Sequence, residues 1–376
     1  MTLTETNLRL FASAKSWIES AATDQLCAIS KLDDVRTVVG FPDLHPGKGG
    51  PVGAAFTTGE MIYPHLIGGD IGCGMALFST DLERRKAKLD RWTETHFDLE
   101  LPWAGDVRDY LPEDHVPTAD FDEALGTVGG GNHFAELQAV EKVYDAETFA
   151  RLGLNREALA IFIHSGSRGL GERIYRTHVD RHCAEGSLAD SDSGEEYLRG
   201  HDFAVRWARA NRALIAERFA AGLSATCERV WDGCHNSITR ISEEDGAGWL
   251  HRKGAASADD DVAVIAGSRG TLSYIVKPLT SNESHAWSLA HGAGRKWSRS
   301  ETRQRMRERF SVNELVQTAL GGRVICEERD LLYEEAPAAY KNIDTVIQDL
   351  VDEKLVTVVA TMRPLLTYKT RGMRRY

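Results

Sequence analysis

Short hydrophobic runs recur along the chain, and stretches with helical spacing lie between some of them. The strand-like runs are VRTVVGF (35–41), GMALFST (74–80), HFAELQAV (133–140), ALAIFIHSG (158–166), DVAVIAGS (261–268) and LVTVVATM (355–362). Runs of this length that are rich in Val, Ile and Phe are typical of strands. Apolar positions at helical spacing occupy residues 6–22, 170–184, 196–223, 298–319 and 342–352. Because strands and helices do not alternate strictly, the pattern predicts an α+β fold.

The sequence also predicts the local structure of three further stretches. The N-terminal sequence MTLTETNLRLFASAKSWIES carries charge throughout, so residues 6–22 are predicted to form an amphipathic helix and not a signal peptide. Polar stretches at 185–200 and 241–261 are predicted to be surface loops or insertions.

Composition excludes some classes of protein. Hydrophobic residues make up 42% of the 376-residue chain and charged residues 27%, as in ordinary globular proteins. No run of about 18 apolar residues occurs, so we expect no membrane span and a cytoplasmic location. The cysteines lack the spacing of a disulfide framework, which favours free thiols or metal ligands. They are Cys27, Cys73, Cys183, Cys227, Cys234 and Cys326.

Charge is distributed unevenly along the chain. The net charge of −11 argues against a protein that coats nucleic acid without specificity, because such binding needs an excess of Lys and Arg. Residues 291–310 nevertheless hold seven Lys or Arg against two Glu. This local excess suits one anionic ligand, and a solvated helix face over 300–310 would explain it equally well.

Five glycine-rich stretches each carry a polar side chain capable of ligation or catalysis. Glycine lets the backbone approach a ligand closely and leaves N–H groups free for phosphate oxygens. One such stretch is a weak signal, whereas five in one chain indicate a shared site. They are FPDLHPGKGGPVG (41–53), GGDIGCGM (68–75), GTVGGGNHFAE (126–136), IHSGSRGLG (163–171) and AGSRGTLSYIV (266–276).

The residue types in these stretches point to metal binding. Asp70 and Cys73, together with His133, His164 and His235, form a complete ligand set for one or two divalent ions. A thiolate can bridge two ions, and the glycines around Cys73 would give both ions room. By affinity alone, Cys and His ligands favour zinc. The alternative for His164 is a buried, hydrogen-bonded core histidine at the end of an apolar run.

His291 indicates a different chemistry. It lies in HGAGR, between small residues and just before Arg295 and Lys296. An imidazole beside a phosphate-binding cluster can attack the α-phosphate of a nucleotide, provided that another group holds its opposite ring nitrogen. A helix-capping or metal-binding histidine is the alternative.

Taken together, these motifs resemble those of the RtcB family of RNA ligases. The matching segments run in the family's order from Pro42 to Lys369, and the resemblance implies one RtcB-like catalytic domain over residues 1–376, with mixed sheets flanked by helices and a central metal and nucleotide cleft. The matching segments are PDLHPGKGGPVG, GGDIGCGM, GTVGGGNHFAE, HSGSRGLG, HRKGA, GSRGTLSYIV, AHGAGR, EEAPAAYKNID and RPLLTYK.

The resemblance implies an activity and its cofactors. The family joins an RNA 3′-phosphate or 2′,3′-cyclic phosphate end to a 5′-hydroxyl end, using GTP and two Mn²⁺ ions, through a guanylylated histidine and an RNA-ppG intermediate. His291 falls on the guanylylated position. One ion would be bound by Asp70, Cys73 and His133, and the second by Cys73, His164 and His235.

Further roles follow from the same resemblance. Arg168, Arg252 and Lys253 are candidates for binding RNA phosphates, and Glu136 with Lys369 for reading the guanine edge. The positions that correspond to guanylate contacts are Asn132, His133, Phe134, Ala135, Glu136, His235, Asn236, Ala266, Gly267, Ser268, Arg269, Ser273, His291, Gly292, Ala293, Gly294 and Lys369.

The sequence also departs from the family pattern. AGSRG replaces the frequent PGSMG, which puts Arg269 near the nucleotide, and the segment TRGMRRY follows Lys369 where many members stop. These features resemble the branch associated with the release-factor-like protein PrfH, which implies repair of ribosomal or transfer RNA. PrfH and archease are the candidate protein partners.

Two other functions use the same residues. A binuclear-metal phosphodiesterase or nuclease would need the Asp, Cys and His set but has no need of a guanylylated histidine. An RNA-binding homologue that has lost catalysis is the third hypothesis, and the presence of every ligand and of the nucleophile speaks against it.

Overall fold

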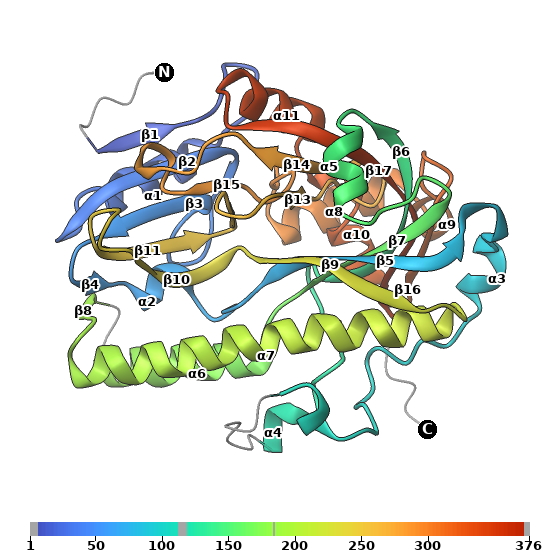
Figure 1. Ribbon diagram of the computed structural model, residues 1–376, viewed down its shortest axis with the longest axis horizontal. Helices are drawn as coiled ribbons and strands as arrows, with labels where there is room; N and C mark the ends of the chain where they lie inside the picture. Colours follow the sequence, from blue (N-terminus) through green and yellow to red (C-terminus); the bar gives the residue numbers. More distant parts are fainter. Residues whose placement is uncertain (1–6, 112–118, 183–184, 372–376) are drawn as a thin grey trace.

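A computed structural model describes residues 7–111, 119–182 and 185–371. Its largest element is a mixed eight-stranded sheet (Figure 1). Along the sheet the order is β13 (Ala263–Ile265), β14 (Ser273–Pro278), β17 (Val356–Thr370), β6 (Phe134–Val143), β7 (Ala158–Ser165), β5 (Gly74–Glu83) and β9 (Cys227–Cys234), and β16 (Arg323–Cys326) pairs in parallel with β17.

A second sheet lies beside the first and has five strands. Its order is β1 (Leu8–Leu10), β2 (Val35–His45), β3 (Val52–Thr58), β11 (Gly248–Lys253) and β10 (Asn236–Ile241). Two small pairs complete the strands described, namely β12 (Ala255–Ser257) with β15 (Ser288–Ala290), and β4 (Met61–Ile62) with β8 (Ser187–Leu188). The mixture of parallel and antiparallel pairing confirms the α+β prediction.

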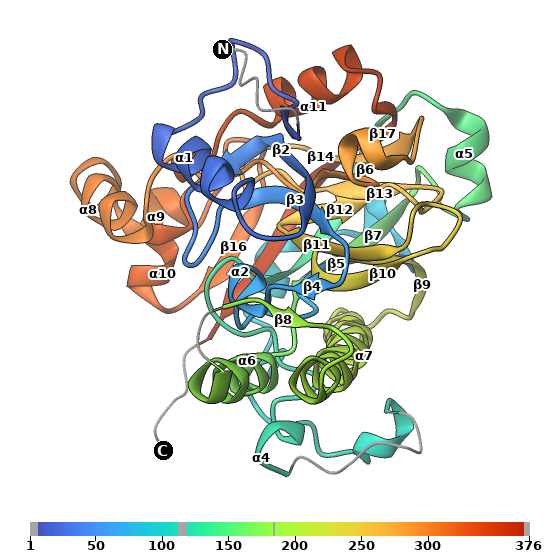
Figure 2. The ribbon, with the colours of Figure 1, turned by 90° about the vertical axis from the view of Figure 1, so that its left-hand side faces the viewer.

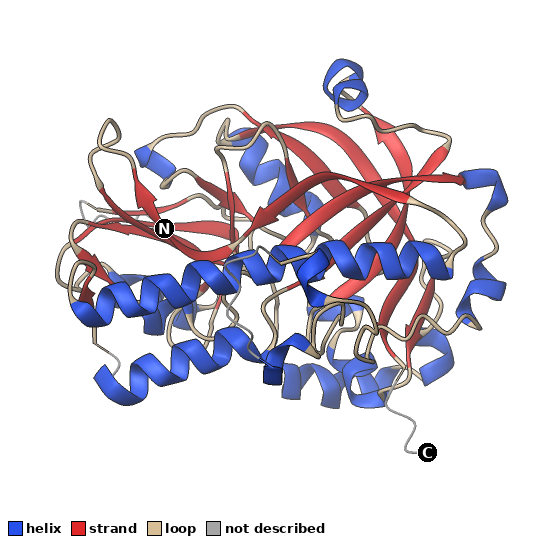
Figure 3. Ribbon diagram, turned by 60° about the horizontal axis from the view of Figure 1, so that its bottom comes forward, coloured by secondary structure: helices blue, strands red, loops and turns tan. Residues whose placement is uncertain are grey.

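Helices cover the sheets from several sides. The two longest, α6 and α7, run side by side beneath both sheets, and α8 to α10 gather at another side (Figures 2 and 3). The α-helices are α1 (Ser20–Ile29), α2 (Pro64–Ile67), α3 (Leu89–Thr93), α4 (Ala119–Asp122), α5 (Ala146–Arg151), α6 (Gly169–His182), α7 (Asp192–Gly222), α8 (Arg299–Arg309), α9 (Val312–Leu315), α10 (Arg329–Glu334) and α11 (Ile343–Asp352). Short 3-10 turns occupy Arg84–Lys86, Val107–Asp109, Glu283–His285 and Pro337–Ala339.

Burial on both faces explains why β7 is apolar almost throughout. Alternate side chains of a strand point to opposite faces of the sheet. Ile161 and Ile163 pack in the core that includes Phe219 of α7, whereas Phe162 packs in the core on the other face with Met362 of β17. A strand with two buried faces therefore has a continuous hydrophobic run and ends at the polar His164-Ser165 pair.

Most of the predicted elements are confirmed. Each strand-like run contains a strand, and helices α6, α7 and α11 lie where helical spacing predicted them. Cys183, at the end of the first of these segments, lies outside the described residues, and the described cysteines are free thiols. Within the described parts of the chain, no helix combines the length and the apolar character that crossing a membrane requires.

Four local predictions, two of helices and two of loops, are wrong, each for a tertiary or capping reason. The helix expected over 6–22 is replaced by β1, whose Leu8 pairs with β2, and by α1. The helix expected over 298–319 is interrupted after Arg309, because Ser311 and Glu314 form a second capping box that starts α9.

The two predicted surface loops contain regular structure. Ser191 accepts a hydrogen bond from the Gly194 N–H and so caps α7 inside the stretch 185–200. The stretch 241–261 contains β11 and β12, and β11 is sandwiched between β3 and β10.

Helix α7 stabilises the strand ends through one fully buried arginine. Arg212 forms a bidentate ion pair with Asp232 of β9 at 2.8 and 2.7 Å. Its Nη1 donates to the carbonyl oxygens of Gly72 and Ser165 at 2.8 and 2.9 Å. Arg209, one turn earlier, also approaches Asp232 but only to 3.8 Å, and its side chain is 54% exposed.

We therefore predict unequal effects of removing these two arginines. Arg212→Ala should lower the free energy of unfolding by about 3–5 kcal/mol, because it leaves the Asp232 side chain with only the distant, exposed Arg209 and removes two buried hydrogen bonds to the backbone. The matched control Arg209→Ala should cost less than about 1 kcal/mol, as for exposed ion pairs. Urea unfolding of both variants measures the difference, and equal losses would contradict this role of Arg212.

Candidate metal and nucleotide site

The five candidate metal ligands meet at one edge of the eight-stranded sheet. Cys73 precedes β5, His133 precedes β6, His164 lies near the end of β7 and His235 follows β9. The strand order β6-β7-β5-β9 places these positions side by side. Asp70 comes from the loop that leads into Cys73.

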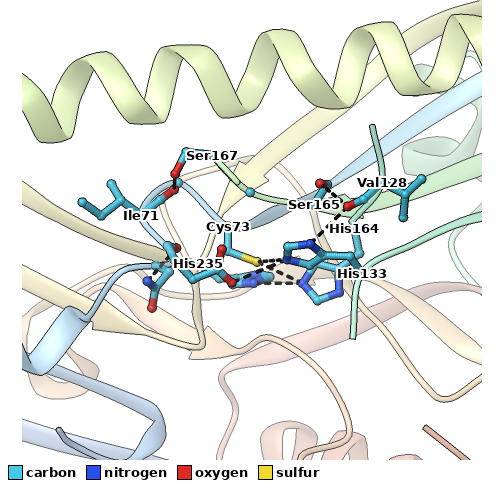
Figure 4. A network of polar contacts seen from close by, with 12 residues as sticks. Ile71, Cys73, Val128, His133, His164, Ser165, Ser167 and His235 are labelled. Carbon is cyan, nitrogen blue, oxygen red and sulfur yellow. Dashed lines mark hydrogen bonds and ion pairs between the residues drawn. The ribbon is translucent and has the colours of Figure 1, made fainter. Parts of the chain in front are cut away.

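Their ligand atoms are close together (Figure 4). Cys73 Sγ lies 3.4 Å from His133 Nε2 and 3.3 Å from His164 Nε2. His164 Nε2 lies 3.3 Å from His235 Nε2, and His133 Nε2 lies 3.5 Å from Asp70 Oδ2. The atoms form two sets, each within 4.8 Å, that share Cys73. Such spacing fits donors that surround an ion at about 2.0–2.3 Å.

The ionisation of His164, His235 and Asp70 favours metal binding, whereas that of Cys73 opposes it until a cation is bound. Burial lowers the pKa of His164 and of His235 well below the usual range, so both rings are neutral and have lone pairs available. Burial and then the charge of Asp70 raise the pKa of the Cys73 thiol. Desolvation opposes ionisation of Asp70 itself, but His133 outweighs it and the pKa of Asp70 falls to about 2. A bound cation would favour the thiolate and release its proton.

Hydrogen bonds behind the ligands fix their orientation. His133 Nδ1 lies 3.2 Å from the Val128 carbonyl oxygen, and donation to that oxygen leaves Nε2 free to bind an ion. Asn211 of α7, fully buried, accepts from the Gly126 N–H and donates to the Ser165 hydroxyl and the Gly166 carbonyl oxygen. The helix thus ties together the two loops that carry His133 and His164.

A glycine is required beside Cys73 for two reasons. Gly72 has a φ of +76°, which L side chains rarely adopt. A Cβ there would also lie 2.8 Å from Cβ of Ala208 on α7. The loop can therefore pass close to the helix only without a side chain at this position.

His291 faces the metal ligands from the other side of the site. Its ring centroid lies 4.7 Å from that of His235. Its Nδ1 lies 2.7 Å from Oδ2 of the fully buried Asp43, which also accepts the His291 backbone N–H at 3.1 Å. Asp43 therefore holds Nδ1, and Nε2 is the ring nitrogen left for chemistry.

The loop that carries Asp43 is held by Lys341. Its ammonium donates to the carbonyl oxygens of Pro42 and Leu44, at 3.0 and 2.5 Å. Gly294 makes a close approach on the same loop, because a Cβ there would lie 2.1 Å from the Asp43 carbonyl oxygen. Small residues around His291 are thus needed for packing as well as for ligand access.

A cavity of about 420 Å³ joins these groups. Most residues with predicted nucleotide contacts line it, as do Asp70, Cys73, His164 and Lys253. The predicted contacts in the wall are Asn132, Phe134, Glu136, His235, Asn236, Ala266, Gly267, Ser268, Arg269, His291, Gly292, Ala293, Gly294 and Lys369. Ala135 points into the core instead, His133 belongs to the ligand cluster, and Ser273 accepts from the Gly267 N–H behind the wall.

The three candidate RNA-binding residues have different surroundings. Lys253 lines the cavity and donates to the Lys48 carbonyl oxygen. Arg168 lies over Gly129 beside the metal ligands. Arg252 is turned into the protein, where it donates to Ser288, Asp259 and the Trp287 carbonyl oxygen. The structure does not bring Arg252 to the cavity.

Several cavity residues have no predicted role. Asp43 belongs to the quoted stretch 41–53, but only the folded chain shows that it contacts His291. The other cavity residues without an assigned role are His45, Glu335, Tyr340 and Thr367, which lie within quoted motifs, and Glu172, Tyr175 and Arg299, which do not. They come from strands β2 and β17, helices α6 and α8 and the segment 335–340, which are far apart in the chain, so spacing could not reveal that they meet.

Comparison with known proteins identifies the family. The profile described as tRNA-splicing ligase RtcB matches residues 25–104 and 104–370. The chain belongs to the RtcB family. RNA-splicing ligase RtcB2 of Escherichia coli strain ATCC 25922 is 44% identical over 366 residues, which span 96% of this chain and 95% of that protein.

More distant relatives carry related names. RNA-splicing ligase RtcB1 of the same strain is 28% identical in an alignment of 421 positions, gaps included, that covers 95% of this chain and 97% of the relative. tRNA-splicing ligase RtcB of Thermococcus kodakarensis is also 28% identical, in an alignment of 417 positions, gaps included, that covers 86% of each chain. The chain is thus more similar to RtcB2 than to RtcB1 of one bacterium, and these RtcB homologues support an RNA-ligase role.

The ligand cluster yields a prediction about metal content. After loading with Mn²⁺ and removal of free ion, Cys73→Ala should lose both ions, whereas His133→Ala and His235→Ala should each lose one. Cys234→Ala is the matched control, because its sulfur contacts carbonyl oxygens and no imidazole. Elemental analysis by mass spectrometry measures the ions per chain. Normal metal content in Cys73→Ala would remove Cys73 from the site.

Proposed function

We propose that the chain is a GTP- and Mn²⁺-dependent RNA ligase, acting as one catalytic domain. It would join RNA ends that carry a 3′-phosphate or 2′,3′-cyclic phosphate to 5′-hydroxyl ends. The observation that carries the proposal is His291, which lies against Asp43 at Nδ1 and beside His235 of the two ligand sets. Membership of the RtcB family supports the RNA-ligase class.

His291 would be the nucleophile. Its Nε2 attacks the α-phosphate of GTP, a P–N bond forms, and pyrophosphate leaves. Asp43 would act as the positioning residue, because its carboxylate stabilises the positive charge that the imidazole gains during attack. The fixed Nδ1 contact also keeps Nε2 on the cavity side of the ring.

Two ions would be held by the two ligand sets. Asp70, Cys73 and His133 would bind one, and Cys73, His164 and His235 the other. When bound, they would supply positive charge against the phosphate oxygens that gain charge during transfer. Affinity alone would favour zinc at Cys and His ligands, so the choice of manganese rests on the family resemblance.

The remaining steps transfer the nucleotide and then release it. An oxygen of the RNA 3′-phosphate attacks the phosphorus bound to His291, which breaks the P–N bond and gives RNA-ppG. The 5′-hydroxyl of the second RNA then attacks the RNA phosphate, a phosphodiester forms, and GMP leaves. A 2′,3′-cyclic phosphate would first be hydrolysed to the 3′-phosphate.

The nucleotide and the RNA would occupy different walls of the cavity. Glu136 and Lys369 are both buried at one end and have the polar groups to bind a guanine edge. Lys253 in the cavity wall and Arg168 outside it are the candidates for RNA phosphates, and Arg252 is not retained because its guanidinium is used inside the protein. Repair of ribosomal or transfer RNA, with PrfH or archease as partner, is the biological role that we propose from the resemblance and from the similarity to RtcB2.

The first reaction step, guanylylation of His291, distinguishes an RNA ligase from a binuclear-metal hydrolase. With GTP labelled at the α-phosphate and Mn²⁺, the wild-type protein should take up acid-labile label, and His291→Ala should take up none. Label on His291→Ala, or no label on the wild type, would favour the hydrolase. Joining of 3′-phosphate and 5′-hydroxyl RNA ends distinguishes a ligase from an inactive RNA-binding homologue.

A second prediction concerns Asp43. Asp43→Asn should slow labelling of His291 by roughly 100-fold or more, because the amide no longer fixes the ring or stabilises its charge. GTP affinity and metal content should stay close to wild type, since Asp43 touches neither ligand set directly. An unchanged labelling rate would contradict the positioning role.

A third prediction concerns Lys369. Lys369 is 4% exposed and lines the cavity, and its ammonium lies 5.9 Å from the centre of the Phe134 ring. Lys369→Ala should weaken GTP binding by roughly tenfold or more, the effect of losing one charged hydrogen bond. Metal content should not change. Loss of metal in this variant would mean that Lys369 supports the ligand cluster and not the nucleotide.

A further inference from the structure

Arg269 carries hydrogen-bond donors that no described residue accepts. It lies in the loop between β13 and β14, lines the cavity and is 6% exposed. Its Nη2 donates to the Leu332 carbonyl oxygen of α10 at 2.9 Å, while Nε and Nη1 have no partner among the described residues. A buried guanidinium with unused N–H groups is unfavourable unless a ligand supplies acceptors. The unused N–H groups therefore indicate that a bound ligand supplies a hydrogen-bond acceptor at Arg269 in the cavity wall.

The neighbouring carboxyl groups do not meet this need. Glu335 accepts from Arg295 at 3.0 Å and from the Tyr340 hydroxyl. Burial raises the pKa of Glu136 to about 8, so this carboxyl is mostly protonated at neutral pH, and its Oε2 has no partner among the described residues. Lys369 adds a second buried cation. This end of the cavity is therefore rich in donors and poor in charged acceptors.

The end of the cavity that holds Glu136 and Lys369 lies further along the sheet than the metal ligands. Phe134 of β6 is opposite His164, whereas Glu136 is opposite Thr367 of β17. Two residues of a strand span about 6–7 Å. A nucleotide whose α-phosphate lies at His291 and the ions would extend its base towards Glu136, Lys369 and Arg269.

We propose that Arg269 selects the base of the nucleotide by donating a hydrogen bond to the oxygen at position 6 of a 6-oxopurine. The inference rests on the nucleotide transfer proposed above and assigns its base selectivity to one residue. Guanine has an acceptor at position 6, whereas adenine has an amino donor there. Adenine would set its amino group against the donors of Arg269 and Lys369.

A chemical double-mutant cycle tests the proposal. The rate of His291 labelling is measured with GTP and with 2-aminopurine ribonucleoside triphosphate, which lacks the 6-oxygen and retains the 2-amino group. In the wild type, loss of the oxygen should reduce kcat/KM by roughly 10- to 100-fold, the range of one good base contact. In Arg269→Met, the fold loss of kcat/KM between GTP and the 2-aminopurine nucleotide should be at least about tenfold smaller than in the wild type. An equal penalty in both proteins would overturn the proposal and leave Arg269 as an anchor of α10.

Two controls show whether a negative result comes from misfolding of Arg269→Met, from failure of the proposed function, or from a wrong assignment of Arg269. Urea unfolding and metal content of Arg269→Met report damage from the lost Leu332 hydrogen bond. If that variant does not fold, the wild-type series tests the 6-oxygen contact that the proposal requires: ITP must be used within about tenfold of GTP, and ATP far less well, because GTP and ITP share the 6-oxygen and the N1–H that ATP lacks. Use of ITP as poor as that of ATP would overturn the proposal. Wild type that takes no label from GTP refutes the proposed function, whereas labelled wild type with an unchanged cycle refutes only the role of Arg269.

Discussion

Cys73 Sγ lies within 3.4 Å of two imidazole nitrogens, and the surrounding structure is arranged to allow that approach. Imidazole rings and a thiol at such distances gain little from one another without a cation. The backbone must therefore hold them by other means. Arg212 and Asn211, both fully buried on α7, bind the carbonyl oxygens of the loops that carry the ligands.

The same constraint explains why the longest helix lies where it does. Helix α7 packs beneath the strand ends, and Gly72 lets the loop before Cys73 touch it. A buried ion pair such as that of Arg212 with Asp232 is weak evidence of stability in general. Here its further hydrogen bonds to Gly72 and Ser165 give it a positional role, because these residues flank the metal ligands.

Much of this arrangement could be predicted from the sequence, and the limits have physical causes. Strands buried on both faces, such as β7, have runs that local pattern identifies, and His164 stands out because it ends such a run. The N-terminal helix was predicted wrongly because Leu8 gains more from pairing with a distant strand than local spacing can indicate. Asp43 and Glu335 were missed as functional residues because their roles depend on contacts with residues far away in the chain. Arg252 illustrates the opposite case, a basic residue in a functional motif whose donors are used internally.

Strand β17 has a consequence for how the protein is made. It lies between β14 and β6 and also pairs with β16, so it joins segments from both halves of the chain. Residues 356–370 leave the ribosome after all these partners, and until then the sheet has a gap at its centre. The wall that includes Lys369 forms only when that gap closes. Contacts of such long sequence separation slow folding, and they keep an incomplete nascent chain from assembling the whole cavity before synthesis has passed β17.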